Sequence, residues 1–368
     1  MSEPKACSVA AIRRNVADRW QKPRPHAPIA AIPQTSPERL AQAQDGDAPH
    51  SSTRLYLAYG SNLSAETFLG HRGIRPLSQV NVTVPTLRLT FDLPGLPYWE
   101  PCFANVAFRK LPEKPKLPIP GQPPKIPPFE PPHHDQNVSD WNGGLVGVVY
   151  EVTSEDYDTI IRTEGGGSSY KEVVVPCIPI PPRFATPEKP PFPELPKPFF
   201  ARTLFAPYLP NTDEPDDPRK DKWWYRFVTR PVRPAPDYAQ ASPRYLKLIT
   251  DGAREHDIPE EYQLYLQSLT PYKPTTCWQQ VGKYLFLLAM LIPFLLIAPL
   301  VFLVGKKANY PPWMATLLAV AFNLTWMLYD NVFKPIFGDG ERTQEEEESR
   351  TRPNRYGRYC DEEKASLL

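Results

Sequence analysis

Proline is the residue that most constrains what this chain of 368 residues can fold into, because it occurs 49 times. Proline lacks an amide hydrogen and has a fixed φ angle, so it is excluded from helix interiors and from central strands. Much of the chain must therefore be loop, linker or polyproline II. Two dense proline runs, in residues 110–135 and 179–198, are expected to be surface insertions in a folded domain. Binding of an SH3-type module is the alternative for the first run.

Charge and cysteine content narrow the class of protein. The net charge is +1 and the pI about 7.6, so no overall field recruits nucleic acid, and we expect no nucleic-acid partner. The five cysteines are widely separated and odd in number, which fits a reducing compartment better than a disulfide framework. The sequence gives no indication of an oligomeric state.

Residues 1–52 are expected to be a disordered tail, because they are rich in Pro, Ala, Gln and Asp. Their first part has no continuous apolar region and is not a secretory signal. A mitochondrial presequence is the alternative, supported by Arg13 and Arg14 but opposed by Glu3 and Asp18.

Short apolar runs bounded by turn residues predict a domain of mixed strands followed by helices. The predicted strands are 54–59, 80–92 with a break at Pro85, 102–109, 144–151, 170–178 and 199–206. The predicted helices are 155–163 after a Thr-Ser cap, a helix to about residue 256 that Ser242-Pro243 opens, and 259–269, which Pro259 opens. This order predicts a compact α+β, barrel-like domain with flanking helices over residues 53–272.

A nearly uncharged apolar stretch, residues 281–304, follows this domain. At about 1.5 Å per residue it would form a helix about 36 Å long, and a hydrocarbon core is about 30 Å thick. Residues 311–333 are a second apolar stretch with aromatic residues near its ends. Together they predict a transmembrane helical hairpin that anchors the chain in a lipid bilayer, followed by a charged tail, 334–368.

Basic residues around these stretches predict the orientation. Lys306 and Lys307 lie in the loop between the stretches, and four basic residues flank the pair: Lys273, Lys283, Lys334 and Arg342. The excess outside the loop favours both termini on the cytoplasmic side. We therefore expect an integral membrane protein whose domain of residues 53–272 is cytosolic.

The first predicted strand runs directly into a glycine turn and two small polar residues. The segment is Tyr56-Leu57-Ala58-Tyr59-Gly60-Ser61-Asn62. Such a turn exposes consecutive backbone N–H groups at a strand end, which suits a carboxylate or another small anion.

Glu164 ends a predicted helix and precedes three glycines. A carboxylate there faces the negative end of the helix dipole, which disfavours its charged form and suits a general base. The alternative is an exposed glutamate before a glycine C-cap.

These features resemble the γ-glutamylcyclotransferase family, enzymes that release the γ-glutamyl group of a peptide as 5-oxoproline. Three blocks carry the resemblance: Tyr59-Gly60-Ser61-Asn62; then Gly147-Val148-Val149-Tyr150, a short helix, Glu164-Gly165 and Tyr170; then Ser242-Pro243-Arg244-Tyr245-Leu246, Gly252-Ala253 and Ile258-Pro259-Glu260-Glu261-Tyr262. It implies that Glu164 is catalytic and that residues 56–62, Tyr170 and Tyr245 bind substrate.

The resemblance also implies a reaction that needs no cofactor and no metal, because the α-amine of the substrate attacks its own γ-carbonyl. The proline insertions resemble those of a fungal branch linked to sulfur-containing secondary metabolism, so γ-glutamyl peptides or glutathione-derived conjugates are the expected substrates. Asn62 differs from the leucine of the glutathione-specific subgroup. A γ-glutamylamine cyclotransferase and a catalytically silent scaffold of the same fold are the alternatives. The run His133-His134-Asp135 could ligate a metal, but solvated loop residues are the simpler interpretation.

Overall fold

The computed structural model describes residues 25–44, 52–109, 141, 143–164, 171–181, 196–206, 227, 233, 238–304 and 311–344. Several sequence predictions lie outside these residues: Tyr170, the insertion 110–135, most of the insertion 179–198, and most of the tail 334–368.

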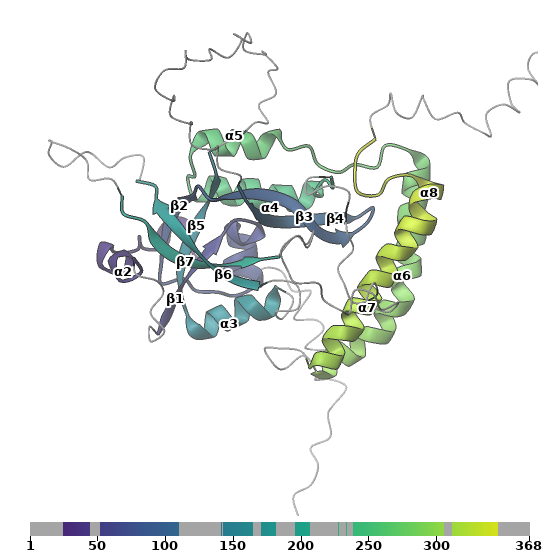
Figure 1. Ribbon diagram of the computed structural model, residues 1–368, viewed down its shortest axis with the longest axis horizontal. Helices are drawn as coiled ribbons and strands as arrows, with labels where there is room; N and C mark the ends of the chain where they lie inside the picture. Colours follow the sequence, from purple (N-terminus) through teal and green to yellow (C-terminus); the bar gives the residue numbers. More distant parts are fainter. Residues whose placement is uncertain are drawn as a thin grey trace, which may run out of the picture.

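Five strands form a closed mixed barrel in the order β1-β5-β2-β6-β7 (Figure 1). Their bounds are β1 Thr53–Ala58, β2 Ser78–Val84, β5 Leu145–Thr153, β6 Lys171–Pro179 and β7 Phe199–Phe205. β1 and β5 are antiparallel, and the barrel closes through a parallel contact of β1 with β7 at Tyr56 and Arg202. The prediction of an α+β barrel-like domain is confirmed.

The strands β3 (Leu87–Leu96) and β4 (Glu100–Phe108) pair with each other in a separate two-stranded sheet. The predicted break at Pro85 separates β2 from β3. The turn between β3 and β4 holds Tyr98 at φ 64°, in the left-handed region. This hairpin reaches from the barrel to the C-terminal helices (Figure 1).

Three helices accompany the barrel where the sequence predicts them, and side-chain caps begin the first two. They are α3 Ser154–Thr163, α4 Pro243–Glu255 and α5 Glu260–Ser268. The Thr153 side chain accepts a hydrogen bond from the Asp156 amide at 3.1 Å, and Ser242 accepts one from the Tyr245 amide at 3.0 Å. Each cap satisfies an amide that a helix start leaves without an intrahelical partner.

Residues 25–44, which composition assigned to a disordered tail, instead form η1 (Ile29–Ala31) and α2 (Pro37–Gln42). The backbone of Gln79 in β2 accepts from Thr35 and donates to Pro33, both at 2.9 Å. Arg39 forms a 3.0 Å ion pair with Glu151 in β5. Such contacts with distant strands leave no periodic signal in a polar sequence, so composition alone missed them.

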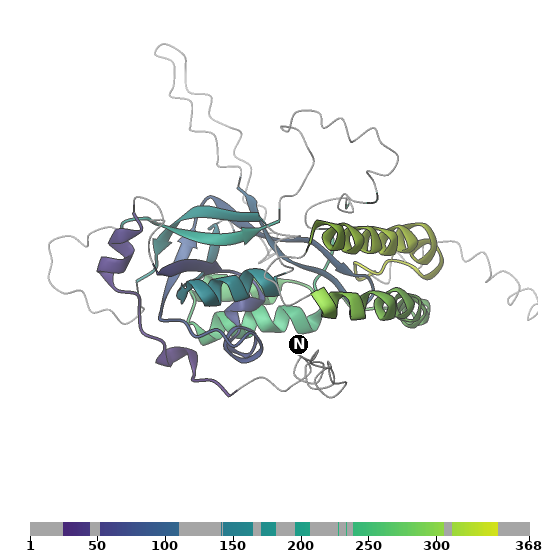
Figure 2. The same cartoon turned by 90° about the horizontal axis from the view of Figure 1, so that it is seen from below.

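The C-terminal apolar region forms α6 (Cys277–Val304), α7 (Pro312–Leu328), a π-helical turn η5 (Tyr329–Phe333) and α8 (Lys334–Phe337). α6 and α7 lie side by side (Figures 1 and 2). Among the described residues, only α6 is long and apolar enough to cross a membrane. The second predicted span, 311–333, is wrong as a continuous apolar helix: α7 has 17 residues, and η5 after it carries a charged Asp330.

The helix pair is bound to the β3–β4 hairpin. Tyr98 packs its ring against Phe286 of α6 and Tyr329 of η5. Its amide donates to the Gly340 carbonyl at 2.7 Å, and its hydroxyl donates to the Gly338 carbonyl at 2.8 Å. The N-terminal part of α6 is therefore part of the folded domain.

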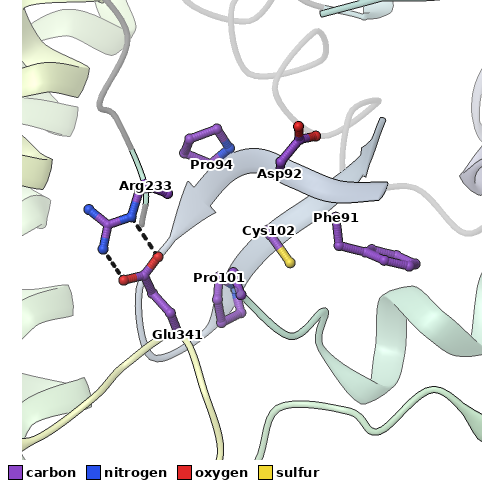
Figure 3. A pocket seen from close by; sticks show the side chains of 8 residues that line it. Phe91, Asp92, Pro94, Pro101, Cys102, Arg233 and Glu341 are labelled. Atoms are coloured by element: carbon purple, nitrogen blue, oxygen red, sulfur yellow. Dashed lines mark hydrogen bonds and ion pairs between the residues drawn. The ribbon is translucent and has the colours of Figure 1, made fainter. Parts of the chain in front are cut away.

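A buried ion pair lies beside the same hairpin (Figure 3). Glu341, which is 0% exposed, pairs with Arg233, and Arg233 also binds Asp330 at 2.9 Å. The guanidinium of Arg233 lies 4.4 Å from the ring centre of Trp326 in α7. Arg233 thus joins the segment after α8 to the helix pair.

Candidate active site

The loop after β1 forms one wall of a pocket. β1 ends at Ala58, and Ser61–Leu63 then form the short 3-10 turn η2. A Cβ atom on Gly60 would lie 3.2 Å from the Tyr245 hydroxyl, so glycine permits the close approach of α4 to this loop. No described residue accepts a hydrogen bond from the amides of Gly60, Ser61 and Asn62. Among the described residues, these amides remain without an acceptor, and their role in binding an anion stays a prediction.

The pocket brings together residues from the three sequence blocks. It is lined by Tyr56, Tyr59, Gly60, Ser61, Asn62, Ala104, Glu164, Leu204 and Tyr245. Two predicted substrate-binding residues do not line it: Leu57 is 0% and Ala58 1% exposed, and both lie in the barrel core. The resemblance covered the whole strand, whereas only part of the strand faces the pocket.

Glu164 caps the C-terminal end of α3, as predicted, and its amide donates to the Ile160 carbonyl at 3.0 Å. Its side chain is 19% exposed and forms an ion pair with Arg72. The Oε1 atom of Glu164 also accepts a hydrogen bond from Nδ2 of Asn62 at 2.9 Å. The exposed glutamate of the alternative interpretation is therefore not what the structure shows.

Arg72 is the residue at this site that the sequence analysis missed. It follows the π-helical turn η3 (Glu66–His71) and donates to both Glu164 and Thr163. A single arginine in a polar stretch has no local signal that distinguishes it from a solvated surface residue. Only the fold brings Arg72 beside Thr163 and Glu164 at the end of α3.

Two buried tyrosines complete the pocket. Asn62 donates through Nδ2 to the Tyr56 hydroxyl at 2.8 Å, and the Ala104 amide donates to the Tyr245 hydroxyl at 3.2 Å. Burial, with a further contribution from Glu164, raises the pKa of both phenols. Both are therefore neutral near pH 7 and contribute hydrogen bonds, not charge.

His256 supports the loop from behind. Its Nε2 lies 3.1 Å from the Leu63 carbonyl oxygen and 2.7 Å from the Tyr150 hydroxyl. Because a carbonyl can only accept, Nε2 carries the hydrogen. Gly252 of α4 approaches the same loop, since a Cβ there would lie 2.4 Å from the Leu63 carbonyl carbon. The Gly252-Ala253 pair of the third block therefore permits close packing of α4 on the loop.

We expect folding stability to fall as the pH drops through the range in which His256 titrates. Burial lowers the pKa of His256 from 6.5 to about 4. Between these values the unfolded chain binds a proton that the folded chain does not, so stability rises with pH. The difference between the two pKa values corresponds to about 3 kcal/mol of unfolding free energy. This stability is fully present above the pKa of the unfolded chain and is lost as the pH falls to the pKa of the folded chain. Denaturant unfolding at several pH values measures it.

His256→Gln isolates this contribution, because glutamine keeps a donor but does not titrate. We expect the variant to show a flatter dependence of unfolding free energy on pH. His71→Gln is the matched control, since the His71 side chain is 48% exposed. Identical pH profiles for wild type and His256→Gln would contradict the assignment.

Comparison with known proteins shows which family the sequence belongs to. No family model matches the chain. The sequence is 30% identical to γ-glutamyl cyclotransferase gliK of Aspergillus fumigatus over 297 residues, covering 80% of this chain and 90% of the relative. It is 29% identical to γ-glutamyl cyclotransferase aclK of Aspergillus oryzae, covering 78% and 89%.

Solved structures are more distant. A γ-glutamyl cyclotransferase structure has 18% identity and a TM-score of 0.35, covering 61% of this chain and 92% of that one. A yeast γ-glutamyl cyclotransferase specific to glutathione has 11% identity and a TM-score of 0.32, covering 59% and 94%. The match to the Aspergillus fumigatus relative, at 30% identity over 90% of that protein, shows that this chain belongs to the γ-glutamyl cyclotransferase family of enzymes.

Proposed function

We propose that this enzyme cyclises the γ-glutamyl group of γ-glutamyl peptides or glutathione-derived conjugates, releasing 5-oxoproline, with Glu164 as the acid/base. One observation carries the proposal: the Glu164 carboxylate and the amide loop of Gly60, Ser61 and Asn62 line the same pocket. A proton acceptor and an anion-binding loop are the two elements that this reaction requires.

The loop holds the γ-glutamyl end of the substrate. Its free amides suit a carboxylate, and the neutral hydroxyls of Tyr56 and Tyr245 supply further hydrogen bonds. Holding the α-amine near the γ-carbonyl converts ring closure into a well-oriented intramolecular step, which can contribute about 7–11 kcal/mol.

The chemistry then needs only proton transfer. The α-amine nitrogen bonds to the γ-carbonyl carbon, and Glu164 takes a proton from that nitrogen. As the original γ-amide C–N bond breaks, Glu164 returns the proton to the leaving nitrogen. The products are 5-oxoproline and the free amine, and no protein nucleophile takes part.

Asn62 supports the proposal that this enzyme differs in substrate from the glutathione-specific subgroup, which has leucine at this position. Its Nδ2 binds both Tyr56 and Glu164, contacts that the leucine of that subgroup cannot make. The intact acid/base and its donors also favour an enzyme over a silent scaffold.

A substrate panel tests the choice of leaving group. Purified full-length enzyme is assayed for kcat/KM with glutathione, a glutathione S-conjugate, γ-glutamyl-alanine and a γ-glutamylamine. We expect kcat/KM to be higher for the peptides or the conjugate than for the γ-glutamylamine. A γ-glutamylamine as the preferred substrate would overturn the proposal in favour of that alternative activity.

We also propose that α6 attaches the enzyme to a lipid bilayer. The support is an exposed apolar face: Leu288, Ile292 and Leu296 are 61%, 66% and 74% exposed, at the spacing of one helix face. Trp278 and Tyr284 are also exposed near the start of α6, and such side chains favour the interface between lipid and water.

Replacing Leu288, Ile292 and Leu296 with glutamine is expected to release the enzyme from membranes. Each substitution removes apolar surface that lipid would cover, worth about 1.5–3 kcal/mol per side chain. Co-flotation with phosphatidylcholine vesicles is the measurement. We expect wild type to float and the triple variant to remain in the dense fraction while still releasing 5-oxoproline.

The matched control carries Leu77→Gln and Leu264→Gln, exposed leucines outside α6. It should float like wild type. Flotation of the α6 variant would show that this face does not bind lipid.

A further inference from the structure

The two hydrogen bonds that Glu164 receives end on the same oxygen. Oε1 accepts from Asn62 Nδ2 at 2.9 Å and from Arg72 Nη2. Within the described part of the chain, no donor is found for Oε2. A carboxylate offers about four lone-pair sites on its two oxygens, so this arrangement holds one oxygen and leaves the other available.

Arg72 is itself held from both sides. Its amide donates to the Thr67 carbonyl at 2.9 Å, which fixes it at the end of η3. Its Nη1 donates to the Thr163 hydroxyl, and that hydroxyl donates to the Thr159 carbonyl at 2.9 Å within α3. The side chain is 12% exposed. The guanidinium therefore connects η3, which follows the amide loop, to the helix end that carries Glu164.

Asn62 is fixed in the same way. It is 4% exposed and uses Nδ2 for both Tyr56 and Glu164. Its Oδ1 is buried without a hydrogen-bond partner among the described residues. A buried acceptor left without a partner is unfavourable.

We propose that Arg72 is a positioning residue that, together with Asn62, fixes Oε1 of Glu164 and presents Oε2 as the atom that exchanges the proton. The inference rests on the proposed function. Glu164 Oε2 is then the acceptor that the pocket offers to an amine. Oε2 takes the proton as the amine nitrogen bonds to the γ-carbonyl carbon, and returns it to the leaving nitrogen as the old C–N bond breaks.

Arg72→Met tests the inference. Without the guanidinium, the carboxylate can rotate, and misplacement of a reacting group by about 1 Å can cost about 100-fold in rate. We expect kcat with γ-glutamyl-alanine to fall by about that factor, with KM changed by less than about threefold because the amide loop is intact. Methylguanidinium added to Arg72→Ala should restore part of kcat, which a purely structural role would not allow.

Arg75→Met is the matched control. Arg75 also follows η3, and among the described residues its Nη1 binds the carbonyls of Leu69 and Ile74 and no carboxylate. We expect this variant to keep wild-type kcat, and unfolding midpoints are measured for all variants.

Three outcomes would overturn the inference. They are a kcat of Arg72→Met within twofold of wild type, a rise in KM alone, and a loss of kcat that follows loss of folding without methylguanidinium rescue. If the wild type is active and any of these outcomes is observed, the inference is overturned and the proposed function stands. A wild type without turnover overturns the proposed function and the inference together.

Discussion

Glu164→Gln is expected to lower the release of 5-oxoproline by about 10²- to 10⁴-fold, the range that a positioned acid/base contributes. Glutamine has nearly the same shape, and its carbonyl oxygen can still accept from Asn62 and Arg72, as Oε1 of Glu164 does. It cannot take up a proton. We therefore expect kcat to fall while the unfolding midpoint stays near that of wild type.

Glu155→Gln is the control for this experiment. Glu155 is an exposed carboxylate in the first turn of the same helix, α3. It should retain wild-type kcat. Wild-type turnover by Glu164→Gln would show that the proton passes through another group, and the proposed mechanism would be wrong.

Among the single substitutions considered, Arg233→Met is expected to cause the largest loss of folding stability. Removing one partner of a buried ion pair leaves the other charge uncompensated and costs about 3–5 kcal/mol. Here Glu341 is 0% exposed, although Lys334 at 3.5 Å supplies a second, weaker cation. The variant also loses the contact with the Trp326 ring. We expect the free energy of unfolding, measured in urea, to fall by about 3 kcal/mol.

A second substitution and a control define this effect. Glu341→Gln in the Arg233→Met background removes the uncompensated charge and should recover part of the loss. Arg244→Met is the control, because Arg244 is 66% exposed and its pair with Glu100 should contribute less than about 1 kcal/mol. Equal effects of Arg233→Met and Arg244→Met would contradict the structural role of the buried pair.

The catalytic domain could be predicted from the sequence because its elements have local signals. The caps at Thr153 and Ser242 mark helix starts, and Pro85 marks a strand break. Apolar runs of strand length gave the barrel strands. The pocket followed from the resemblance, which related the amide loop to Glu164 and Tyr245.

The remaining features depend on contacts between distant segments. Arg72 acquires its role only because the fold places this residue, which follows η3, beside the end of α3. Residues 25–44 are held by hydrogen bonds to β2 and an ion pair with β5. Their polar composition does not predict these contacts. The second predicted span was wrong because hydropathy does not register that Asp330 pairs with Arg233 and that the helix changes pitch at Tyr329.

The most direct test of the account is the release of 5-oxoproline from γ-glutamyl-alanine by the purified full-length enzyme, quantified by mass spectrometry. The account predicts one 5-oxoproline and one alanine per γ-glutamyl-alanine consumed by wild type, and loss of this turnover in Glu164→Gln. Release of glutamate in place of 5-oxoproline, or no release by a folded wild-type enzyme, would contradict it.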